Sequence, residues 1–113
     1  QWIQLRAHGQ AGSWCGRRKH QVVSHRGHLY LLGGYAMEGT SSLNLNDVWR
    51  SDDGAHWSQI TPRAPWSGRD GHVALEHLGS IYIMGGTQDL RSNDNDVWRS
   101  ANGVNWVQVC RAA

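Results

Sequence analysis

The chain has 113 residues, of which 39% are hydrophobic and 18% carry a formal charge, and this length suits an ordinary single domain. Its 11 basic and 9 acidic residues give a net charge of +2. The basic residues are scattered and form no stripe of the kind expected on a nucleic-acid-binding face. No apolar run approaches the roughly 18 residues that a transmembrane helix needs. We therefore expect no nucleic-acid partner and no transmembrane segment, while the compartment stays open.

An internal repeat dominates the sequence. The hexapeptide Asn-Asp-Val-Trp-Arg-Ser at 46–51 recurs letter for letter at 95–100. Two further segments match between the copies: Gly-Arg-x-x-His at 16–20 and 68–72, and apolar-Tyr-apolar-apolar-Gly-Gly at 29–34 and 81–86. A period of about 40 to 50 residues with Gly and Trp at fixed places predicts a repeat architecture.

Each copy is expected to form four short antiparallel strands. In chain order, the first strand ends near His25 or His77, and the second is strongly apolar and ends at the glycine pair. The third is the Asp-Val-Trp-Arg-Ser segment, and a turn at Asp53-Gly54 or Asn102-Gly103 leads to the fourth. Such dipeptides provide the positive φ angles of a tight hairpin turn. No window shows a sustained period of 3.6, so the prediction is an all-β fold.

The order of these motifs resembles the kelch repeat. The form Asn-Asp-Val-Trp-x-Ser-x-x-Gly-x-x-Trp is similar to kelch-like repeats in large repetitive proteins of microbial eukaryotes and bacteria. The resemblance covers nearly the whole chain and implies two four-stranded propeller blades, residues 16–60 and 68–109. Residues 1–5 repeat the fourth-strand pattern and are interpreted as the orphan outer strand of a preceding blade. The expected architecture is therefore a partial propeller.

The recurring positions are interpreted as structural. They are Arg17, Arg69, His20, His72, Gly33, Gly34, Gly85, Gly86, Asp47, Asp96, Trp49, Trp98, Gly54, Gly103, Trp57 and Trp106. The duplicated arginines and aspartates are expected to form inter-strand or inter-blade pairs, because the planar guanidinium suits buried pairing. The recurring histidines are expected to make local hydrogen bonds. Asp53 becomes Asn102 in the second copy, which indicates that the geometry of the turn is kept and not a chemical role.

No catalytic, metal or cofactor site is predicted, and the protein is not expected to be an enzyme. The sequence has no Gly-x-Ser-x-Gly elbow and no phosphate loop, and its histidines recur as repeat positions without converging ligands. Cys15 and Cys110 lie in linkers two blades apart, beyond the Cα–Cα reach of about 7 Å for a disulfide. Free thiols are expected.

Two blades leave two broad apolar faces uncovered, and repeat units are stabilised by their neighbours. The chain is expected to be a fragment of a longer repeat protein, because it starts with Gln and its orphan strand has no blade. The alternative is a complete small subunit whose ends dock on partners or close a ring of copies. In either case other proteins or missing blades would cover the open faces, with the chain as a subunit of a larger complex.

Two functions remain in view. The first is a non-catalytic protein–protein interaction or scaffold module, with the variable loops 35–45 and 87–94 as contact surfaces. The second is a carbohydrate-binding module that stacks sugars on Trp14 or Trp66, although the near-equivalent places of these residues in the repeat favour a structural role. The candidate contact residues are Trp14, Trp66, Tyr35, Met37, Asp89 and Arg91.

Overall fold

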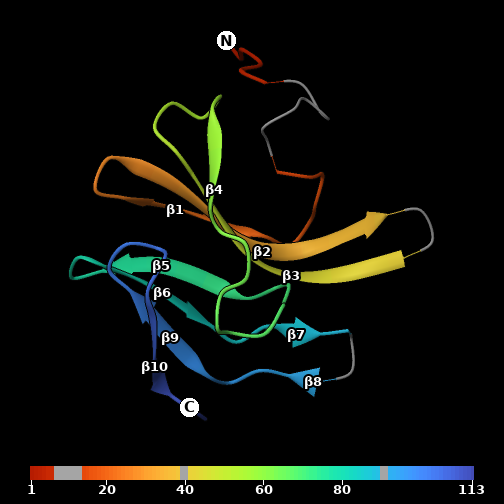
Figure 1. Cartoon of the computed structure of the whole chain (residues 1–113), viewed down its shortest axis with the longest axis vertical. Helices are drawn as coiled ribbons and strands as arrows, with labels where there is room; N and C mark the ends of the chain where they lie inside the picture. The colour runs from red at the N-terminus through yellow and green to blue at the C-terminus, as the bar shows by residue number, and fades with distance from the viewer. Residues whose placement is uncertain (7–13, 39–40, 90–91) are drawn as a thin grey trace.

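The computed structural model describes residues 1–6, 14–38, 41–89 and 92–113. Within these ranges the chain contains no helix, and its strands form two four-stranded antiparallel sheets and one two-stranded sheet. Figure 1 shows the two larger sheets one beside the other, each built from one copy of the repeat. The all-β prediction is confirmed. Among the same residues there is no helix long and apolar enough to cross a membrane.

The first repeat unit, residues 14–64, holds the first sheet. Its strands lie in sequence order: β1 (Gln21–His25), β2 (His28–Glu38), β3 (Ser41–Ser51) and β4 (Trp57–Thr61). The turn between β1 and β2 is Arg26-Gly27, whose φ angles are 51° and 80°. Two successive positive φ angles give the turn the twist that a two-residue hairpin requires.

The second repeat unit, residues 66–113, forms an equivalent sheet. The strands lie in the order β5 (Val73–His77), β6 (Ser80–Met84), β9 (Val97–Ser100) and β10 (Trp106–Cys110). Its first hairpin turns at Leu78-Gly79, again with two positive φ angles, 48° and 79°. Two short strands, β7 (Thr87–Gln88) and β8 (Ser92–Asn93), pair as a separate sheet between β6 and β9.

The described residues of the predicted variable loops are largely β-structure, which corrects the sequence interpretation. In the first unit β2 and β3 continue past the glycine pair, with Tyr35 opposite Asn44 and Ala36 opposite Leu43. The register shifts between Leu32 and Gly34, and this bulge lets the ladder resume beyond the glycines. The extended hairpin and the β7–β8 hairpin point to the same side of the molecule (Figure 1).

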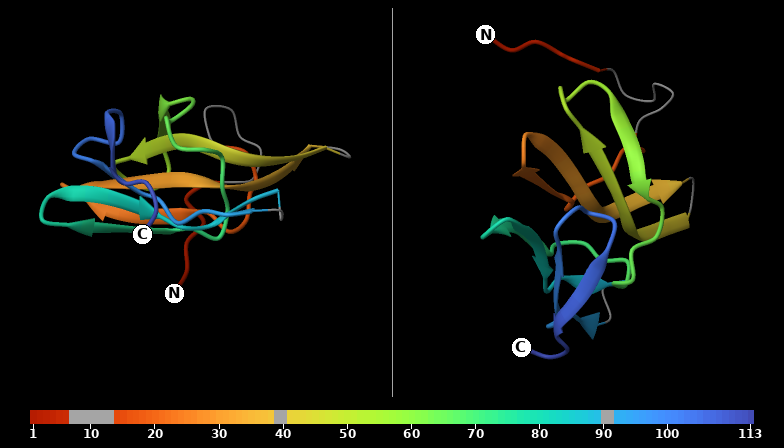
Figure 2. Two further views of the ribbon diagram at one scale, coloured as in Figure 1. Left: turned by 90° about the horizontal axis from the view of Figure 1, so that it is seen from below. Right: turned by 60° about the vertical axis from the view of Figure 1, so that its left-hand side comes forward.

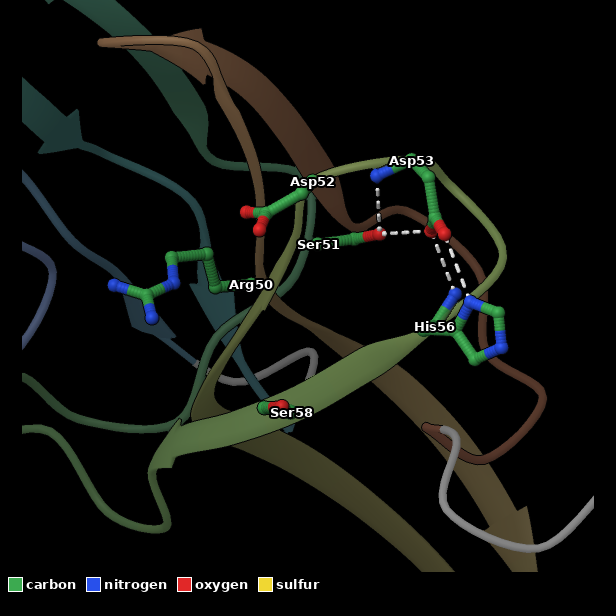
Figure 3. A pocket seen from close by; sticks show the side chains of 6 residues that line it. All are labelled: Arg50, Ser51, Asp52, Asp53, His56 and Ser58. Atoms are coloured by element: carbon green, nitrogen blue, oxygen red, sulfur yellow. Dashed lines mark hydrogen bonds and ion pairs between the residues drawn. The ribbon is translucent and has the colours of Figure 1, made fainter.

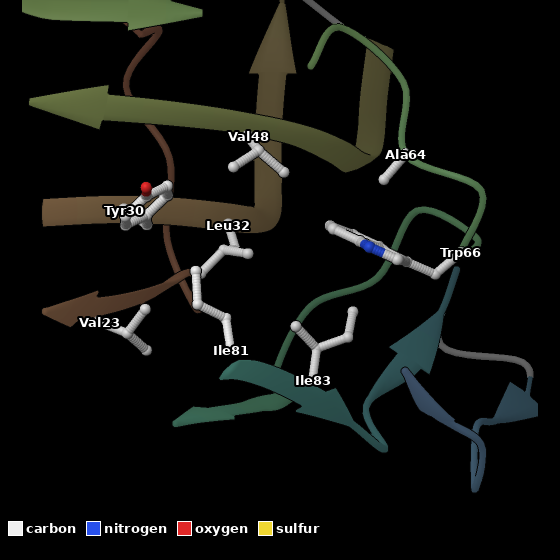
Figure 4. Close-up of a cluster of buried hydrophobic side chains, with 8 residues drawn as sticks. All are labelled: Val23, Tyr30, Leu32, Val48, Ala64, Trp66, Ile81 and Ile83. Atoms are coloured by element: carbon white, nitrogen blue, oxygen red, sulfur yellow. The ribbon is translucent and has the colours of Figure 1, made fainter. Parts of the chain in front are cut away.

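The main hydrophobic core lies between the two units. It consists of Val23, Tyr30, Leu32 and Val48 from the first sheet, Ala64 and Trp66 from the connecting segment, and Ile81 and Ile83 from β6 (Figure 4). One face of the first sheet is thus covered by the second unit. Figure 2 shows the sheets as stacked layers in its left view, and the N- and C-terminal ends of the chain far apart in its right view.

Candidate interaction surface

A buried ion pair anchors each unit. The Arg17 guanidinium donates two hydrogen bonds to the Asp47 carboxylate, at 2.6 and 2.9 Å, and Trp49 Nε1 donates to the same carboxylate at 2.9 Å. Arg69 and Asp96 repeat this arrangement at 2.6 and 3.0 Å. The hydrogen bonds from Arg69 hold the pKa of Asp96 below its ordinary value. Every carboxylate oxygen of both pairs is therefore engaged in a hydrogen bond within its own unit.

The two linker tryptophans pack against the fourth strands. Trp66 meets Trp106 edge to face, with ring centroids 5.7 Å apart, and only 1% of Trp66 is exposed. Trp14 meets Trp57 in the same way at 5.9 Å and is half-buried. A sugar cannot stack on a buried indole, so the structure places Trp66 in the core and removes it from the candidate contact residues.

The turn after each third strand is built by its own side chains. Ser51 Oγ accepts from Gly54 N at 2.8 Å, and Asp53 Oδ1 accepts from the amides of Ala55 and His56 at 2.8 Å each. These amides, with the His56 side chain, hold the pKa of Asp53 well below its usual range. Ser100 and Asn102 make the same hydrogen bonds in the second unit.

A pocket of about 190 Å³ lies over the first of these turns (Figure 3). It is lined by Arg50, Ser51, Asp52, Asp53, His56 and Ser58. In the second unit the turn keeps its geometry with Asn102 in place of Asp53. The carboxylate in this pocket is therefore accounted for by the turn, as the sequence comparison of the two copies indicated.

Three other candidate contact residues lie on the two hairpins. Tyr35 lies under the Arg18 guanidinium, 4.9 Å from the ring centroid, and Met37 is 60% exposed beside it. Asp89 is exposed on the β7–β8 hairpin, and its amide donates to Asn44 Oδ1 at 2.9 Å. The remaining candidate, Arg91, lies outside the described residues. The structure brings Tyr35 and Met37 together and ties Asp89 to the neighbouring hairpin.

Polar contacts accompany the core between the two units. His72 Nε2 donates to the Leu32 carbonyl at 3.0 Å, and Gly34 N donates to the Arg69 carbonyl at the same distance. The predicted local bond of His72 is thus a bond to the other unit, 40 residues away. Burial, which penalises the charged imidazole, lowers the pKa of His72 to about 4. A neutral imidazole is therefore built into the interface.

The side of the first sheet that the second unit covers is called the covered face. Residues directly opposite one another in a sheet share a face, and the strand register places two rows here. They are Val23–Tyr30–Arg50–Ser58 and Gln21–Leu32–Val48–Thr61. Thr61 Oγ1 donates to the Gly103 carbonyl of the second unit at 2.9 Å. Ile60, in the bulge between the two rows, also packs against the core.

The second sheet has an equivalent side, which we call the open face. Its rows are Leu75–Tyr82–Arg99–Val107 and Val73–Met84–Val97–Cys110, with Val109 in the same bulge. Four apolar side chains on this face are 40 to 58% exposed: Val73, Leu75, Val107 and Val109. The described residues contain no further four-stranded sheet to cover it. The open face therefore presents the same positions as the covered face without a neighbour.

The N-terminal segment lies against the other side of the first unit. A Cβ built on Gly54 would lie 3.3 Å from Leu5 Cδ1, just as one built on Gly103 would lie 3.0 Å from Ile60 Cδ1. Arg6 Nη1 also donates to the Ala55 carbonyl at 3.0 Å. Leu5 thus takes the place on the first unit that Ile60 takes on the second, although residues 1–5 form no strand and Leu5 is 61% exposed.

Sequence reasoning missed the open-face residues, although a signal for them was present. Val73 and Leu75 stand two residues apart on one strand, and in the first copy the aligned positions are Gln21 and the core residue Val23. A core position of the first unit that recurs with greater exposure in the second marks a surface that a further layer would cover. Reading the repeat alignment together with the alternation of the strands would have found this face.

Comparisons with known proteins give no assignment. No protein-family model matches the chain, and none of the curated proteins matches it either. Both cysteines are free, as expected. Among the described residues no group of three or more His, Cys, Asp or Glu side chains is placed to hold a metal ion.

Proposed function

We propose that this protein is a non-catalytic scaffold or protein–protein interaction module of the kelch type, and that it binds its partner through the open face of the second unit. One observation carries the proposal: the equivalents on the open face of the covered-face core residues are apolar and are all more exposed than their counterparts, with Leu75, Tyr82, Met84 and Val97 in place of Val23, Tyr30, Leu32 and Val48. In this proposal the two sheets are adjacent propeller blades, and the partner supplies the next layer.

Burial of apolar surface is the driving force. Exposed apolar surface that gathers on one face marks an interaction site, whereas single apolar residues on a surface need no explanation. Removing such surface from water is worth about 25 cal/mol per Å². Tyr82 and Met84 in the middle of the face are already half-buried, and Leu75 and Val109 flank them at 40% and 50% exposure. A partner therefore gains apolar contact across the whole sheet.

The carbohydrate-binding alternative loses support. Trp66 is buried, and Trp14 is half-buried against Trp57. The polar groups near the turns are engaged in their own hydrogen bonds. Neither of the two tryptophans that were expected to stack sugars is therefore a fully exposed indole.

The proposal can be tested with a three-unit chain. A duplicate of residues 65–113 is appended after Ala113, which keeps the phase of the repeat because Ala113 and Ala64 make the same backbone bond to Asn95 and Asn46. Cys110 serves as a reporter, since it occupies on the open face the position of Thr61 on the covered face. With Cys15 changed to Ser and the appended copy of Cys110 changed to Thr, only Cys110 reacts with a disulfide reagent.

Docking is expected to slow the reaction of Cys110 by at least about tenfold, because a covered thiol reacts only when the units open. Leu75→Lys in the second unit should restore the fast reaction of Cys110, since it places a charge in the open-face row that docking buries. Val22→Lys is the matched control, because Val22 is 47% exposed on β1 and lies on the side of the first sheet opposite the covered face. An appended unit that leaves the rate of Cys110 unchanged would contradict the proposal.

A further inference from the structure

A histidine and a carboxylate join the two units at the covered face. His25 is 1% exposed, and its Nδ1 lies 2.6 Å from Glu76 Oε2, while its Nε2 lies 2.9 Å from the Ala101 carbonyl. Both partners belong to the second unit, and both atoms are hydrogen-bond acceptors. The first unit thus recognises a carboxylate and a turn carbonyl on the unit that covers it.

His77 repeats this group on the open face. The His25 ring stands against Tyr30 at 5.7 Å and 63°, and the His77 ring stands against Tyr82 at 6.0 Å and 62°. His77 is exposed, and its ring nitrogens make no hydrogen bond within the described residues. The aromatic support and the direction of the ring are already in place. Only the carboxylate and the carbonyl are lacking.

The charge on the open face agrees with an acidic partner. Its two rows contain Arg99 and no acidic side chain, and His77 stands beside them. Interfaces pair potentials of opposite sign, which fixes the register of the partners and disfavours wrong ones. A partner that carries a carboxylate at this edge therefore fits better than one that does not.

We propose that the open face takes a further four-stranded repeat unit that offers a carboxylate to His77, in the way that Glu76 is offered to His25. This proposal rests on the proposed function and specifies its partner. The partner unit also carries an aliphatic pair at the positions of Ile81 and Ile83, since these side chains fill the covered face. His77 and Arg99 set the specificity, and the apolar rows provide the contact area.

A second copy of this chain fits the face less well. Its first unit has Ser24 at the position of Glu76, so it would offer a hydroxyl to His77 where a carboxylate is expected. Leu5 also lies against Gly54, on the side of the first unit where a docked unit would place its own fourth strand. The two observations are independent, and both favour a distinct unit that bears a carboxylate.

The test is a double-mutant cycle in the three-unit chain described above, with the appended unit as the probe. His77→Gln is made in the second unit, and Glu76→Gln is made in the appended copy alone. The rate of Cys110 modification reports docking in the unsubstituted three-unit chain, in the two single variants and in the double variant. Each single variant should speed the modification about tenfold, and the double variant should be little faster than either, because contacting residues are not additive. Restoring a carboxylate with Asp in the appended copy should recover part of the protection.

The outcomes separate the two proposals. If Cys110 is protected but the two substitutions act additively, the appended unit binds the open face without a contact between its carboxylate and His77. That result overturns the inference and leaves the proposed function standing. If Cys110 is unprotected in every chain, both are overturned. A stable dimer of the unextended two-unit chain in light scattering, abolished by Leu75→Lys, would identify a second copy as the occupant and overturn the inference.

Discussion

The covered face of the first unit and the open face of the second are built from the same positions, yet they differ in what surrounds them. Tyr30 is 3% exposed and belongs to the core, whereas its equivalent Tyr82 is only half-buried. His25 is enclosed by two acceptors, and His77 faces outward. In a repeat protein the burial of a residue is set by the neighbouring unit as much as by its own strand. The residues exposed on the open face therefore indicate which side chains a partner at that face would offer.

The largest expected effect comes from the linker tryptophans. Trp66→Ala should lower the free energy of unfolding by about 4 kcal/mol, because it opens a cavity in the core between the units. Trp14→Ala removes a half-buried ring from the edge of the first unit, so it should cost about 2 kcal/mol. Urea unfolding followed by circular dichroism measures both. Equal losses would show that the two units do not differ at this position.

The matched tyrosines compare the two faces directly. Tyr30→Ala should cost about 3 kcal/mol and Tyr82→Ala about 1 kcal/mol, since only the first side chain is enclosed by a neighbouring unit. Appending a third unit should raise the cost of Tyr82→Ala toward that of Tyr30→Ala. The same unfolding measurement applies, and a cost of Tyr82→Ala that the third unit leaves unchanged would argue against docking at the open face.

The interface histidine makes stability depend on pH. The pKa of His72 falls from 6.5 to about 4 on folding, so the unfolded chain binds a proton in this range that the folded chain does not. Its contribution is complete above pH 6.5 and is lost as the pH falls toward 4. At pH 4.5 the loss amounts to about 2 kcal/mol relative to pH 7.5. His72→Gln should remove that part of the pH dependence, and unfolding at both pH values measures it; an unchanged pH dependence would mean that His72 is charged in the folded state.

The first glycine of each Gly-Gly pair gives the smallest expected difference in stability between the two units. Gly33 and Gly85 both have positive φ, 62° and 70°, so Ala is strained by about 1 kcal/mol at either position. A Cβ on Gly33 would lie 3.0 Å from His72 Cε1, whereas one on Gly85 would meet only Asp94 O at 3.7 Å. Gly33→Ala should therefore cost about 1 kcal/mol more than Gly85→Ala. Thermal unfolding compares the two, and an equal loss would mean that His72 moves aside freely.

Part of the fold could be predicted because it depends on near neighbours in sequence. The apolar second strands, the Asp53-Gly54 and Asn102-Gly103 turns and the pairing of Arg17 with Asp47 all follow from motifs that recur in both copies. A turn closed by its own Ser and Asp side chains carries its geometry with it. The extended hairpin between 35 and 45 was missed, because the bulge after Leu32 lets two strands continue where a variable loop was expected.

The sequence by itself determined the repeat, the all-β class and the structural character of the recurring residues, because each copy encodes its own strands and turns. Only the tertiary structure decided which side of each sheet is covered, that His72 bonds across to Leu32, and that Glu76 meets His25. These contacts join residues 40 and 51 positions apart. No local pattern specifies them, because they exist only once one unit is stacked on the other.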